Sequence, residues 1–491
     1  MTAGKKLLLL GLLLYLLFWR YQVSAIRFLD ADEFSYMHWT AQVARGQIMY
    51  RDFFSYFTPL FMWVFAPIFW MYGVSAQVFA AGRVFSFVIF LVMLGGLGVL
   101  WGMTRGWKWA LLPAVILAFL PMPYDKFLEI RPDNLAVLLA ILGVIGEIRG
   151  LQTKKNIWWA VSGLFYALSL MTLAKTVPIV VAGVGIAILS AFYSKSFRSF
   201  TLLMAGLVGP WILFFGVAAI SGQLSVTWYS LTKLAVEIYA NIKNYPMEPN
   251  LFFYPNASFY GGTGHAITTA LIVNHAVWIL GILVGVYRLV SPFRRAGREW
   301  LSELLVSGTF IASILVFSKF FPLKHSQYLI PIAIFIAYYA ADGLALFFDW
   351  LEKAGGTASL LIILLGFGYI LVVVTQEIHT PKLAVTSTTQ LTELTKLIST
   401  VPQGSRVVDL EGRMVFWTEG YPVCCLAFDT FLSSVSRPPA PLAQYLATNP
   451  ADYIWDGDSG RMATLTAENM AYIRDNFAPV DGWGGRLWKR K

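Results

Sequence analysis

Long apolar stretches recur along the chain from the N-terminus to about residue 375, and short polar loops separate them. A helix that crosses a bilayer needs roughly 20 mostly apolar residues. The lengths of these stretches therefore predict about eleven membrane-spanning helices. We expect them near 7–24, 78–103, 107–121, 133–149, 156–174, 176–193, 200–220, 272–290, 300–318, 327–348 and 358–375.

The stretch 59–72 is also apolar, but it is shorter and contains Pro59 and Pro67. The basic residues decide its placement, because cytoplasmic loops of membrane proteins are enriched in Lys and Arg. If the N-terminus is inside and 59–72 stays at the interface, every inner loop is basic. If 59–72 crossed the membrane instead, the later basic loops would lie outside. The inner loops then carry Lys5, Lys6, Arg105, Lys108, Arg149, Lys154, Lys155, Lys195, Arg198, Arg288, Arg294, Arg295, Arg298 and Lys353.

This topology predicts that three longer segments and the C-terminal tail lie on the outer face of the membrane. The three outer loops are 25–77, 121–132 and 221–271, and the tail is 376–491. We therefore expect a mainly α fold in which residues 1–375 form a polytopic transmembrane helical bundle.

The tail 376–491 is more polar than the rest of the chain, and its pattern changes. The segments 406–410 and 452–455 are typical of short buried strands, and 466–476 has a helical pattern. About 115 residues are enough for a small domain. The tail is therefore predicted to be a small extracytoplasmic α/β domain.

Composition supports the membrane interpretation and limits the possible partners. Hydrophobic residues make up 57% of the chain and charged residues 13%, whereas a soluble domain carries about 25% charged residues. The net charge of +10 is concentrated in the short loops that set topology, so it does not indicate nucleic-acid binding. Basic, aromatic-rich loops suit contact with anionic membrane lipid.

The cysteines and the N-terminus add little about the compartment. Cys424 and Cys425 are the two cysteines of the chain, and because adjacent cysteines rarely pair, we expect no disulfide. Their spacing fits no metal site, so none is predicted. The first apolar stretch could alternatively be a signal peptide that ends near Ala25, but the bulky residues before that point favour a retained helix.

The first outer loop begins with an acidic pair, Asp32 and Glu33, shortly after Asp30. Acidic residues at a membrane boundary are costly to bury and call for an explanation. In one interpretation they are exposed and simply solvate the chain. In the other, two carboxylates in different environments acquire different pKa values, and one acts as a general base.

The second outer loop carries Asp125, Glu129 and Arg131, and Arg131 lies directly before a predicted helix start at Pro132. The planar guanidinium of arginine suits phosphate oxygens. Alternatively, Arg131 forms a salt bridge with an acid and staples two loops together. The two roles are compatible.

Further cations lie at the outer ends of later predicted spans. Lys175 lies between two apolar stretches, and Lys324 and His325 lie close to Tyr328. A cationic, aromatic-edged patch suits the phosphate of a lipid-linked substrate. The alternatives are that Lys175 reaches toward the interface and that the other residues contact lipid headgroups.

These residues share one face of the membrane only because of the predicted topology. A carboxylate base and cations that stabilise a departing phosphate are what a glycosyl transfer needs. Donors that are nucleotide sugars are less compatible, because they are cytosolic while the acids lie outside.

The pattern resembles the GT-C superfamily of polyprenyl-phosphate-sugar-dependent membrane glycosyltransferases, in particular the branch of protein O-mannosyltransferases and aminoarabinose-lipid A transferases. The resemblance extends from residue 7 to about residue 350. It rests on Asp32-Glu33, Tyr36, Gly46, Tyr50-Arg51-Asp52-Phe53, Thr58-Pro59, Gly82-Arg83, Arg131-Pro132-Asp133, Lys175 and His325-Ser326-Gln327-Tyr328. Many members have a basic residue where Gln327 stands, so Lys324 or His325 would take over its contact with the donor phosphate.

The resemblance implies an inverting transfer from a polyprenyl-phosphate-linked sugar to a lipid, glycan or protein acceptor, with Asp32 as the general base and Glu33 beside it. It also implies a bacterial plasma membrane, with the active site on the periplasmic side. Tyr36, Arg51 and Asp52 are then candidate substrate contacts. Members of the family differ in their need for a divalent metal, and no site here demands one, although Asp32 and Asp125 could hold a divalent cation.

Two other functions compete with the transferase. A transporter or flippase of lipid-linked glycans would need charged residues along a path through the spans, and only Arg83, Glu147 and Asp342 lie near span ends. A surface-polysaccharide polymerase or ligase would depend on arginines in a large outer loop, and 221–271 contains none. The sequence therefore favours the glycosyltransferase.

Overall fold

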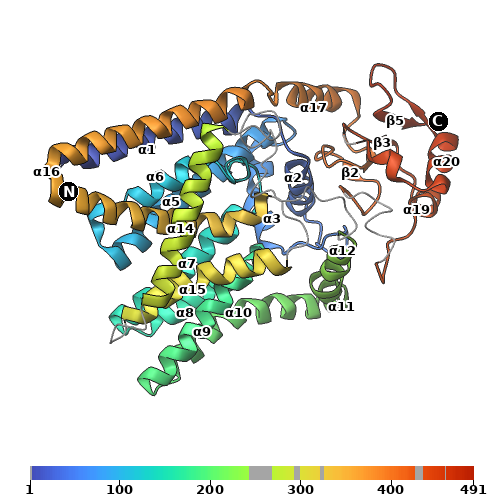
Figure 1. The fold of residues 1–491 in the computed structure, drawn as a ribbon. Coiled ribbons are helices and arrows are strands. Elements are labelled where there is room, and N and C mark those ends of the chain that lie inside the picture. The colour runs from blue at the N-terminus through green and yellow to red at the C-terminus, as the bar shows by residue number, and fades with distance from the viewer. Residues whose placement is uncertain (1–2, 243–267, 292–298, 321–325, 426–434, 459) are drawn as a thin grey trace. The chain divides into compact units, whose positions relative to one another are not determined.

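The computed structural model describes residues 3–242, 268–291, 299–320, 326–425, 435–458 and 460–491. This part of the chain contains eight helices that are long and apolar enough to cross a membrane, so the chain is an integral membrane protein (Figure 1). They are α1 (Ala3–Ile26), α5 (Gln77–Arg105), α7 (Pro132–Thr153), α9 (Val177–Ser194), α10 (Arg198–Ile220), α14 (Thr269–Val290), α15 (Glu299–Phe320) and α16 (Ile330–Leu383).

The longest helix, α16, accounts for two predicted spans. Its backbone leaves helical geometry at Gly356, where φ is 73°, a conformation that glycine adopts at little cost. The bend separates the predicted spans 327–348 and 358–375. The predicted stretches 107–121 and 156–174 contain α6 (Leu112–Phe119) and α8 (Ile157–Thr172), so a helix lies within each predicted stretch while the number of spans stays a prediction.

The stretch 59–72 forms two short helices, α3 (Leu60–Phe65) and α4 (Pro67–Tyr72). Pro67 opens α4 at a position that needs no backbone N–H. Neither helix approaches the length of a span, as expected for a segment that stays at the interface.

The chain divides into two compact units. The helical unit comprises Met1–Arg27, Val84–Leu213 and Met247–Thr386, and the loop–tail unit comprises Phe28–Arg83, Phe214–Pro246 and Ser387–Lys491. The first outer loop and the tail therefore belong to one folded unit, although most of the chain separates them in sequence.

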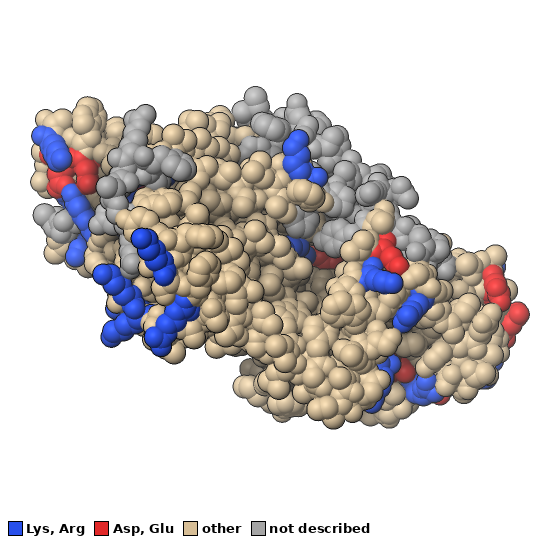
Figure 2. All heavy atoms as spheres, turned by 90° about the horizontal axis from the view of Figure 1, so that it is seen from below, with Lys and Arg blue, Asp and Glu red and all other residues tan. Residues whose placement is uncertain are grey.

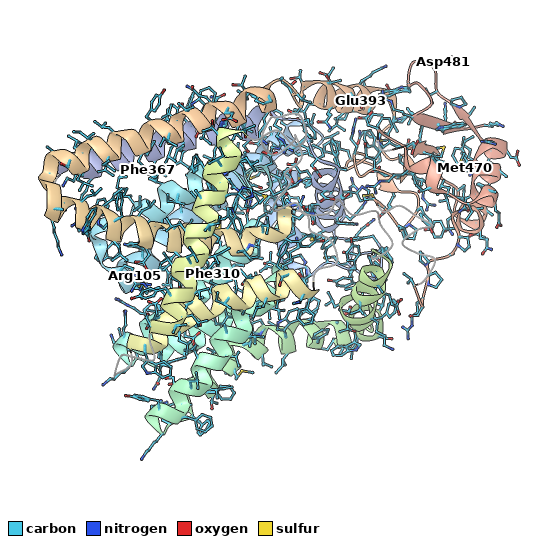
Figure 3. The ribbon with its side chains drawn as sticks, viewed as in Figure 1. Arg105, Phe310, Phe367, Glu393, Met470 and Asp481 are labelled. Carbon is cyan, nitrogen blue, oxygen red and sulfur yellow. A yellow bond between two sulfur atoms is a disulfide. The ribbon has the colours of Figure 1, made fainter. Side chains whose placement is uncertain are left out.

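Small residues allow close helix packing in the helical unit. A Cβ on Gly163 of α8 would lie 2.0 Å from the backbone oxygen of Leu203 on α10, and a Cβ on Gly206 would lie 2.2 Å from that of Ala160. Glycines at both places thus let two backbones meet, as is common between membrane helices. Phe310 of α15 (Figure 3) packs against Tyr339 of α16 with ring centroids 5.4 Å apart.

Charged residues are sparse on the surface of these apolar helices. In the face shown in Figure 2, residues other than Lys, Arg, Asp and Glu cover broad areas, and the Lys and Arg side chains lie in separate groups. Arg105, at the end of α5 (Figure 3), pairs with Glu303 and with Asp342, the latter at 3.2 Å. Such pairing lowers the cost of charge at a helix end.

The tail contains the predicted α/β domain. Its five-stranded sheet has the order β2-β1-β3-β5-β4, with β1 parallel to β2 and β3, and β5 antiparallel to β3 and β4. The strands are β1 (Arg406–Asp409), β2 (Thr418–Glu419), β3 (Tyr453–Trp455), β4 (Phe477–Pro479) and β5 (Leu487–Arg490), and the helices are α17 (Thr388–Thr400), α19 (Leu442–Thr448) and α20 (Ala467–Asn476). The predicted strands at 406–410 and 452–455 and the predicted helix at 466–476 are thereby confirmed.

Within the loop–tail unit, the tail binds the first outer loop around α2 (Ala31–Ala44). Leu29 donates its N–H to Gln390 at 2.6 Å and accepts a hydrogen bond from the same side chain at 2.9 Å. Phe54 donates its N–H to the oxygen of Pro422 at 2.7 Å. Among the described residues, this unit also contains α11 (Leu224–Tyr229) and α12 (Ala235–Ile242), joined by a π-helical turn at Ser230–Leu234.

Candidate functional site

The acidic pair lies in the first turn of α2, and the local sequence explains why the helix begins there. Asp30 is the N-cap, and its side chain accepts the N–H of Asp32 at 3.0 Å. Glu33 accepts the N–H of Asp30 at 2.9 Å, which completes a capping box. The acids at 30 and 33 therefore define the start of this helix.

Glu33 is a buried, charge-paired side chain. It is 0% exposed and accepts hydrogen bonds from Nε of Arg83 at 2.9 Å and from Nη2 at 2.6 Å. Arg83 also donates to the backbone oxygen of Phe28 at 2.7 Å. This bidentate pair joins α2 to the start of α5, an arrangement that suits a structural role.

Asp32 differs from Glu33 in exposure, because it is only half-buried. It lies beside the backbone N–H groups of the first turn, where the helix dipole favours a carboxylate. Tyr36 follows one turn later and is buried among aromatic rings, 5.3 Å from Phe57 and 5.6 Å from Phe61 between centroids. The structure thus brings Asp32, Glu33 and Tyr36 together on one helix.

Arg51 and Asp52 form a more exposed pair later in the same loop. Their side chains are 2.6 Å apart, with 51% and 28% exposed. The hydrogen bond from Arg51 lowers the pKa of Asp52. Asp52 also accepts the N–H of Ile48 at 2.8 Å, so it closes a turn.

In the helical unit, Asp133 links two predicted phosphate-binding residues, Arg131 and Lys175. Its Oδ1 lies 2.7 Å from Nζ of Lys175, and its Oδ2 lies 3.5 Å from Nε of Arg131. The ammonium group of Lys175 also lies over the ring of Tyr328, 4.2 Å from its centroid. Pro132 starts α7 next to Arg131, and a 3₁₀ turn at Ala174–Thr176 places Lys175 between α8 and α9.

Asp125 and Glu129 lie in a denser network of charges. Lys382 donates to both oxygens of Asp125 at 2.6 and 2.7 Å. Glu129 pairs with Lys126 at 2.8 Å, with Arg27 at 3.0 Å and with Arg131 at 2.9 Å. Burial alone would raise the pKa of both carboxyls, but these cations outweigh burial and lower it.

This network bears on two expectations. Arg131 does pair with an acid, Glu129, but both residues belong to the second outer loop, so this ion pair does not staple two loops together. Asp125 is poorly suited to hold a divalent cation, because both of its oxygens bind Lys382 and because it is 2% exposed. Lys324 and His325 lie outside the described residues.

Several charged partners were not anticipated from the sequence. Arg27 and Lys382 follow the first and last apolar stretches, where basic residues ordinarily mark topology, so nothing in the pattern indicated that they pair with the second outer loop. His38 was also missed, because nothing near it in the sequence suggests a partner. Its ring nitrogens lie 3.1 Å from Asp409 and 3.2 Å from Glu419.

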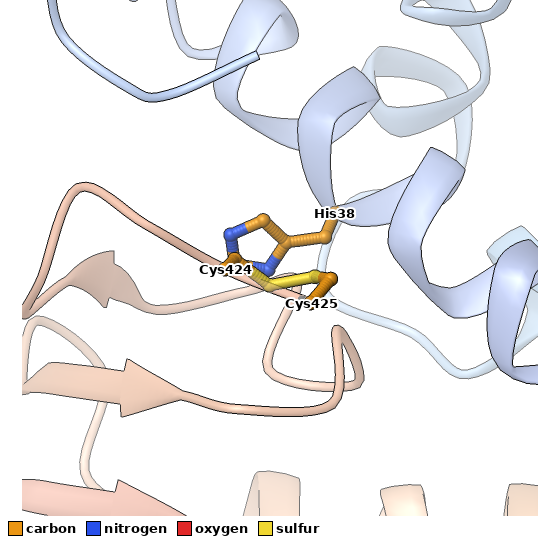
Figure 4. A group of neighbouring side chains, drawn as sticks. All are labelled: His38, Cys424 and Cys425. Atoms are coloured by element: carbon orange, nitrogen blue, oxygen red, sulfur yellow. A yellow bond between two sulfur atoms is a disulfide. The ribbon is translucent and has the colours of Figure 1, made fainter. Parts of the chain in front are cut away.

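The expectation that Cys424 and Cys425 stay unpaired is wrong, because they form a disulfide (Figure 4). The backbone at Cys425 is left-handed, with φ of 70°, and both residues are buried. This turn brings together two sulfur atoms that would point apart in an extended chain.

No family model and no curated protein sequence matches the chain. Solved structures do match. ArnT from Cupriavidus metallidurans bound to undecaprenyl phosphate is 11% identical, with 92% of this chain and 89% of that chain covered and a TM-score of 0.53. In the apo state the same protein is 12% identical, with 99% and 97% covered and a TM-score of 0.54.

An oligosaccharyltransferase has a similar structure. AglB from Archaeoglobus fulgidus, in complex with an inhibitory peptide and a dolichol-phosphate, is 10% identical over all of this chain and 75% of that chain, with a TM-score of 0.54. At such low identity the likeness shows a shared fold. The chain therefore has the fold of GT-C membrane glycosyltransferases, and the resemblance seen in the sequence is confirmed at that level.

Proposed function

We propose that the protein is a membrane glycosyltransferase that moves a sugar from a polyprenyl-phosphate carrier to an acceptor hydroxyl at the outer face. The shared fold supports this reaction class. The observation that carries the proposal is the difference between the two acids of α2. Glu33 is buried and held by Arg83, whereas Asp32 is half-buried at the same helix start.

Asp32 is the base in this proposal. It accepts the proton of the acceptor hydroxyl while the hydroxyl oxygen bonds to the anomeric carbon and the bond from that carbon to the phosphate oxygen breaks. The electron pair of the broken bond leaves with the polyprenyl phosphate. A single displacement from the opposite side inverts the anomeric configuration.

Arg131 and Lys175 stabilise the departing phosphate, with Tyr328 packed against Lys175. A phosphate would compete with Asp133, which links the two cations. Positive charge that is already oriented before the reaction costs little reorganisation in the transition state. The predicted topology has this cluster and Asp32 on the outer face.

The test is turnover by purified protein given a panel of polyprenyl-phosphate sugars and a crude membrane acceptor fraction, measured as release of polyprenyl phosphate. A general base contributes about 10²- to 10⁴-fold, so Asp32→Asn should lower turnover by that factor without changing the thermal stability of the protein. Asp481→Asn, at an exposed acid of the tail (Figure 3), is the matched control and should retain full activity.

Near-normal turnover in Asp32→Asn would exclude Asp32 as the base. If the folded wild-type protein releases polyprenyl phosphate from none of the donors, the transferase proposal fails, and a transporter or a pyrophosphate-linked donor becomes the better explanation. The charged residues near span ends do not favour the transporter. Arg83 pairs with Glu33, Asp342 with Arg288, and Glu147 with Tyr166.

A further inference from the structure

Three side chains of types that bind metals lie close together in the loop–tail unit, although their spacing in the sequence matches no metal-binding motif. A ring nitrogen of His38 and the sulfur atoms of Cys424 and Cys425 all lie within 4.8 Å of one another (Figure 4). All three are buried, with exposures of 1%, 1% and 5%. His38 comes from α2 and the cysteines from the loop after β2.

The imidazole of His38 is fixed in orientation by Asp409. Asp409 Oδ2 lies 3.1 Å from Nδ1 of His38, and the same carboxylate accepts the backbone N–H groups of Gly412 at 2.8 Å and Met414 at 2.7 Å. A carboxylate on one ring nitrogen is the usual means of orienting a histidine whose other nitrogen binds a metal. Nε2 of the ring faces Glu419 Oε1 and the side-chain nitrogen of Gln42, each at 3.2 Å.

Glu419 provides a second observation that points to a ligand. Its Oε1 lies 3.2 Å from Nε2 of His38, while its Oε2 is buried and has no hydrogen-bond partner among the described residues. A buried carboxylate oxygen without a partner is costly. Asp409 and Glu419 both face the ring, and Arg45 is a further cation acting on Glu419, so Oε2 of Glu419 is the acceptor of this cluster that the described residues leave unsatisfied.

We propose that this cluster is a redox-gated Zn²⁺ site, formed when the Cys424–Cys425 disulfide is reduced. The ligands are Nε2 of His38 and the two cysteine thiolates, with Glu419, which faces the ring but lies outside the 4.8 Å group, moving in as the fourth; this set of nitrogen, oxygen and sulfur suits zinc. Asp409 orients the histidine. This inference concerns a separate site and does not depend on the proposed transfer reaction.

The chemistry balances with a dithiol as reductant. The dithiol attacks the disulfide by thiol–disulfide exchange, is itself oxidised to a disulfide, and leaves Cys424 and Cys425 as thiols. Zn²⁺ then displaces the two thiol protons and the proton on Nε2 of His38, and these three protons go to solvent. In the oxidised protein the sulfur atoms are poor ligands, because the thiolate is the metal-binding form.

The test uses untagged, full-length protein in detergent, with Zn²⁺ and Co²⁺ as probes. Alkylation before reduction should label neither cysteine. After treatment with a dithiol and its removal, the protein should bind one Zn²⁺ per chain, and Co²⁺ in its place should show thiolate-to-metal charge-transfer absorption. The oxidised protein should bind neither ion at the same concentrations.

Variants separate this site from adventitious binding. Cys424→Ser and Cys425→Ser should each abolish the charge-transfer band or reduce it to about half. Asp409→Asn should weaken Zn²⁺ affinity roughly 10- to 100-fold, the usual effect of losing such an orienting group. His275→Gln, at a histidine of α14 in the helical unit, is the matched control for His38→Gln and should bind normally.

Three results would overturn the proposal. They are labelling of both thiols before reduction, equal Zn²⁺ binding by oxidised and reduced protein, and unchanged binding in the serine variants. If His38→Gln fails to fold, Glu419→Gln carries the test instead, because it preserves the size of the side chain and removes one ligand charge. Normal Zn²⁺ affinity in Glu419→Gln would then contradict the ligand set.

Discussion

Asp125 and Glu129 of the second outer loop and Glu33 of α2 are buried and paired with cations, and they differ in exposure from Asp32 of the same helix. In the helical unit, Asp125 and Glu129 are 2% and 0% exposed, and each pairs with at least two basic side chains. At α2, Glu33 has the same character, while Asp32 remains half-buried. Buried ion pairs fix geometry, so a carboxylate that reaches the solvent is the better candidate for proton transfer.

The largest effect expected in this comparison comes from breaking a buried pair in the helical unit. Asp125→Asn leaves Lys382 and Arg27 buried beside a neutral side chain, which costs about 3–5 kcal/mol when one partner of a buried pair is removed. Unfolding by SDS in mixed micelles should measure this loss. Asp349→Asn, at an exposed pair with Lys108 in the same unit, is the control and should unfold like the wild type.

The next effect concerns a buried cation in the loop–tail unit. Burial lowers the pKa of His38, but hydrogen bonds with Asp409 and Glu419 outweigh burial and raise it from 6.5 to about 9. A pKa difference of one unit corresponds to about 1.4 kcal/mol. The interactions of protonated His38 with Asp409 and Glu419 therefore stabilise the oxidised, zinc-free protein by at most about 3 kcal/mol.

The direction of this pH effect follows from linkage. Because the pKa is higher in the folded state, the contribution is complete below the ordinary value of 6.5 and is lost as the pH rises through about 9. Hydrogen exchange of the α2 amides, corrected for intrinsic rates, should therefore show weaker protection above about pH 9 than below pH 6.5. A protection profile in His38→Gln that falls with pH as in the wild type would contradict this assignment.

A smaller effect, on donor affinity, distinguishes the two roles considered for Arg131, which are contact with the donor phosphate and ion pairing with an acid. Hydrogen bonds to charged groups contribute about 1.5–3 kcal/mol, so Arg131→Ala should weaken donor binding by roughly 10- to 150-fold if Arg131 contacts the donor phosphate. Equilibrium binding of a polyprenyl phosphate measures this. Arg149→Ala, at an exposed arginine, serves as control. If Arg131→Ala leaves donor affinity unchanged and lowers stability, Arg131 acts through ion pairing, as with Glu129, and does not contact the donor phosphate.

The smallest effect is expected at Arg51 and Asp52, where solvent screens the charges. Asp52→Asn should leave global unfolding unchanged and should only loosen the turn that Asp52 closes on Ile48. Local hydrogen exchange would detect this. A large loss of turnover in this variant would instead support a direct contact between Asp52 and the substrate.

Features set by local sequence were predictable. Apolar stretches gave the helices, Pro67 divided 59–72 into α3 and α4, and short apolar runs gave strands β1 and β3. The positions of Arg131 and Lys175 beside helix starts were predictable from the same pattern. Asp133, which joins them, is visible only in the structure.

Features that depend on distant contacts were not predictable. The bend at Gly356 requires a left-handed conformation, which glycine permits but does not demand. The pairing of Lys382 with Asp125 joins residues 257 positions apart, and a basic residue near a span end ordinarily signals only topology. The disulfide depends on the backbone turn at Cys425, which adjacent cysteines do not specify.

The attachment of α2 to the tail has a consequence for biosynthesis. His38 and Asp409 are 371 positions apart, and Leu29 and Gln390 are 361 apart. Because chains emerge from the ribosome N-terminus first, the helix that bears Asp32 leaves the ribosome long before its partners do. Until residues 387–491 have been synthesised, α2 lacks these contacts, so the surroundings of the helix that bears Asp32 are completed only after more than 350 further residues have been added to the chain.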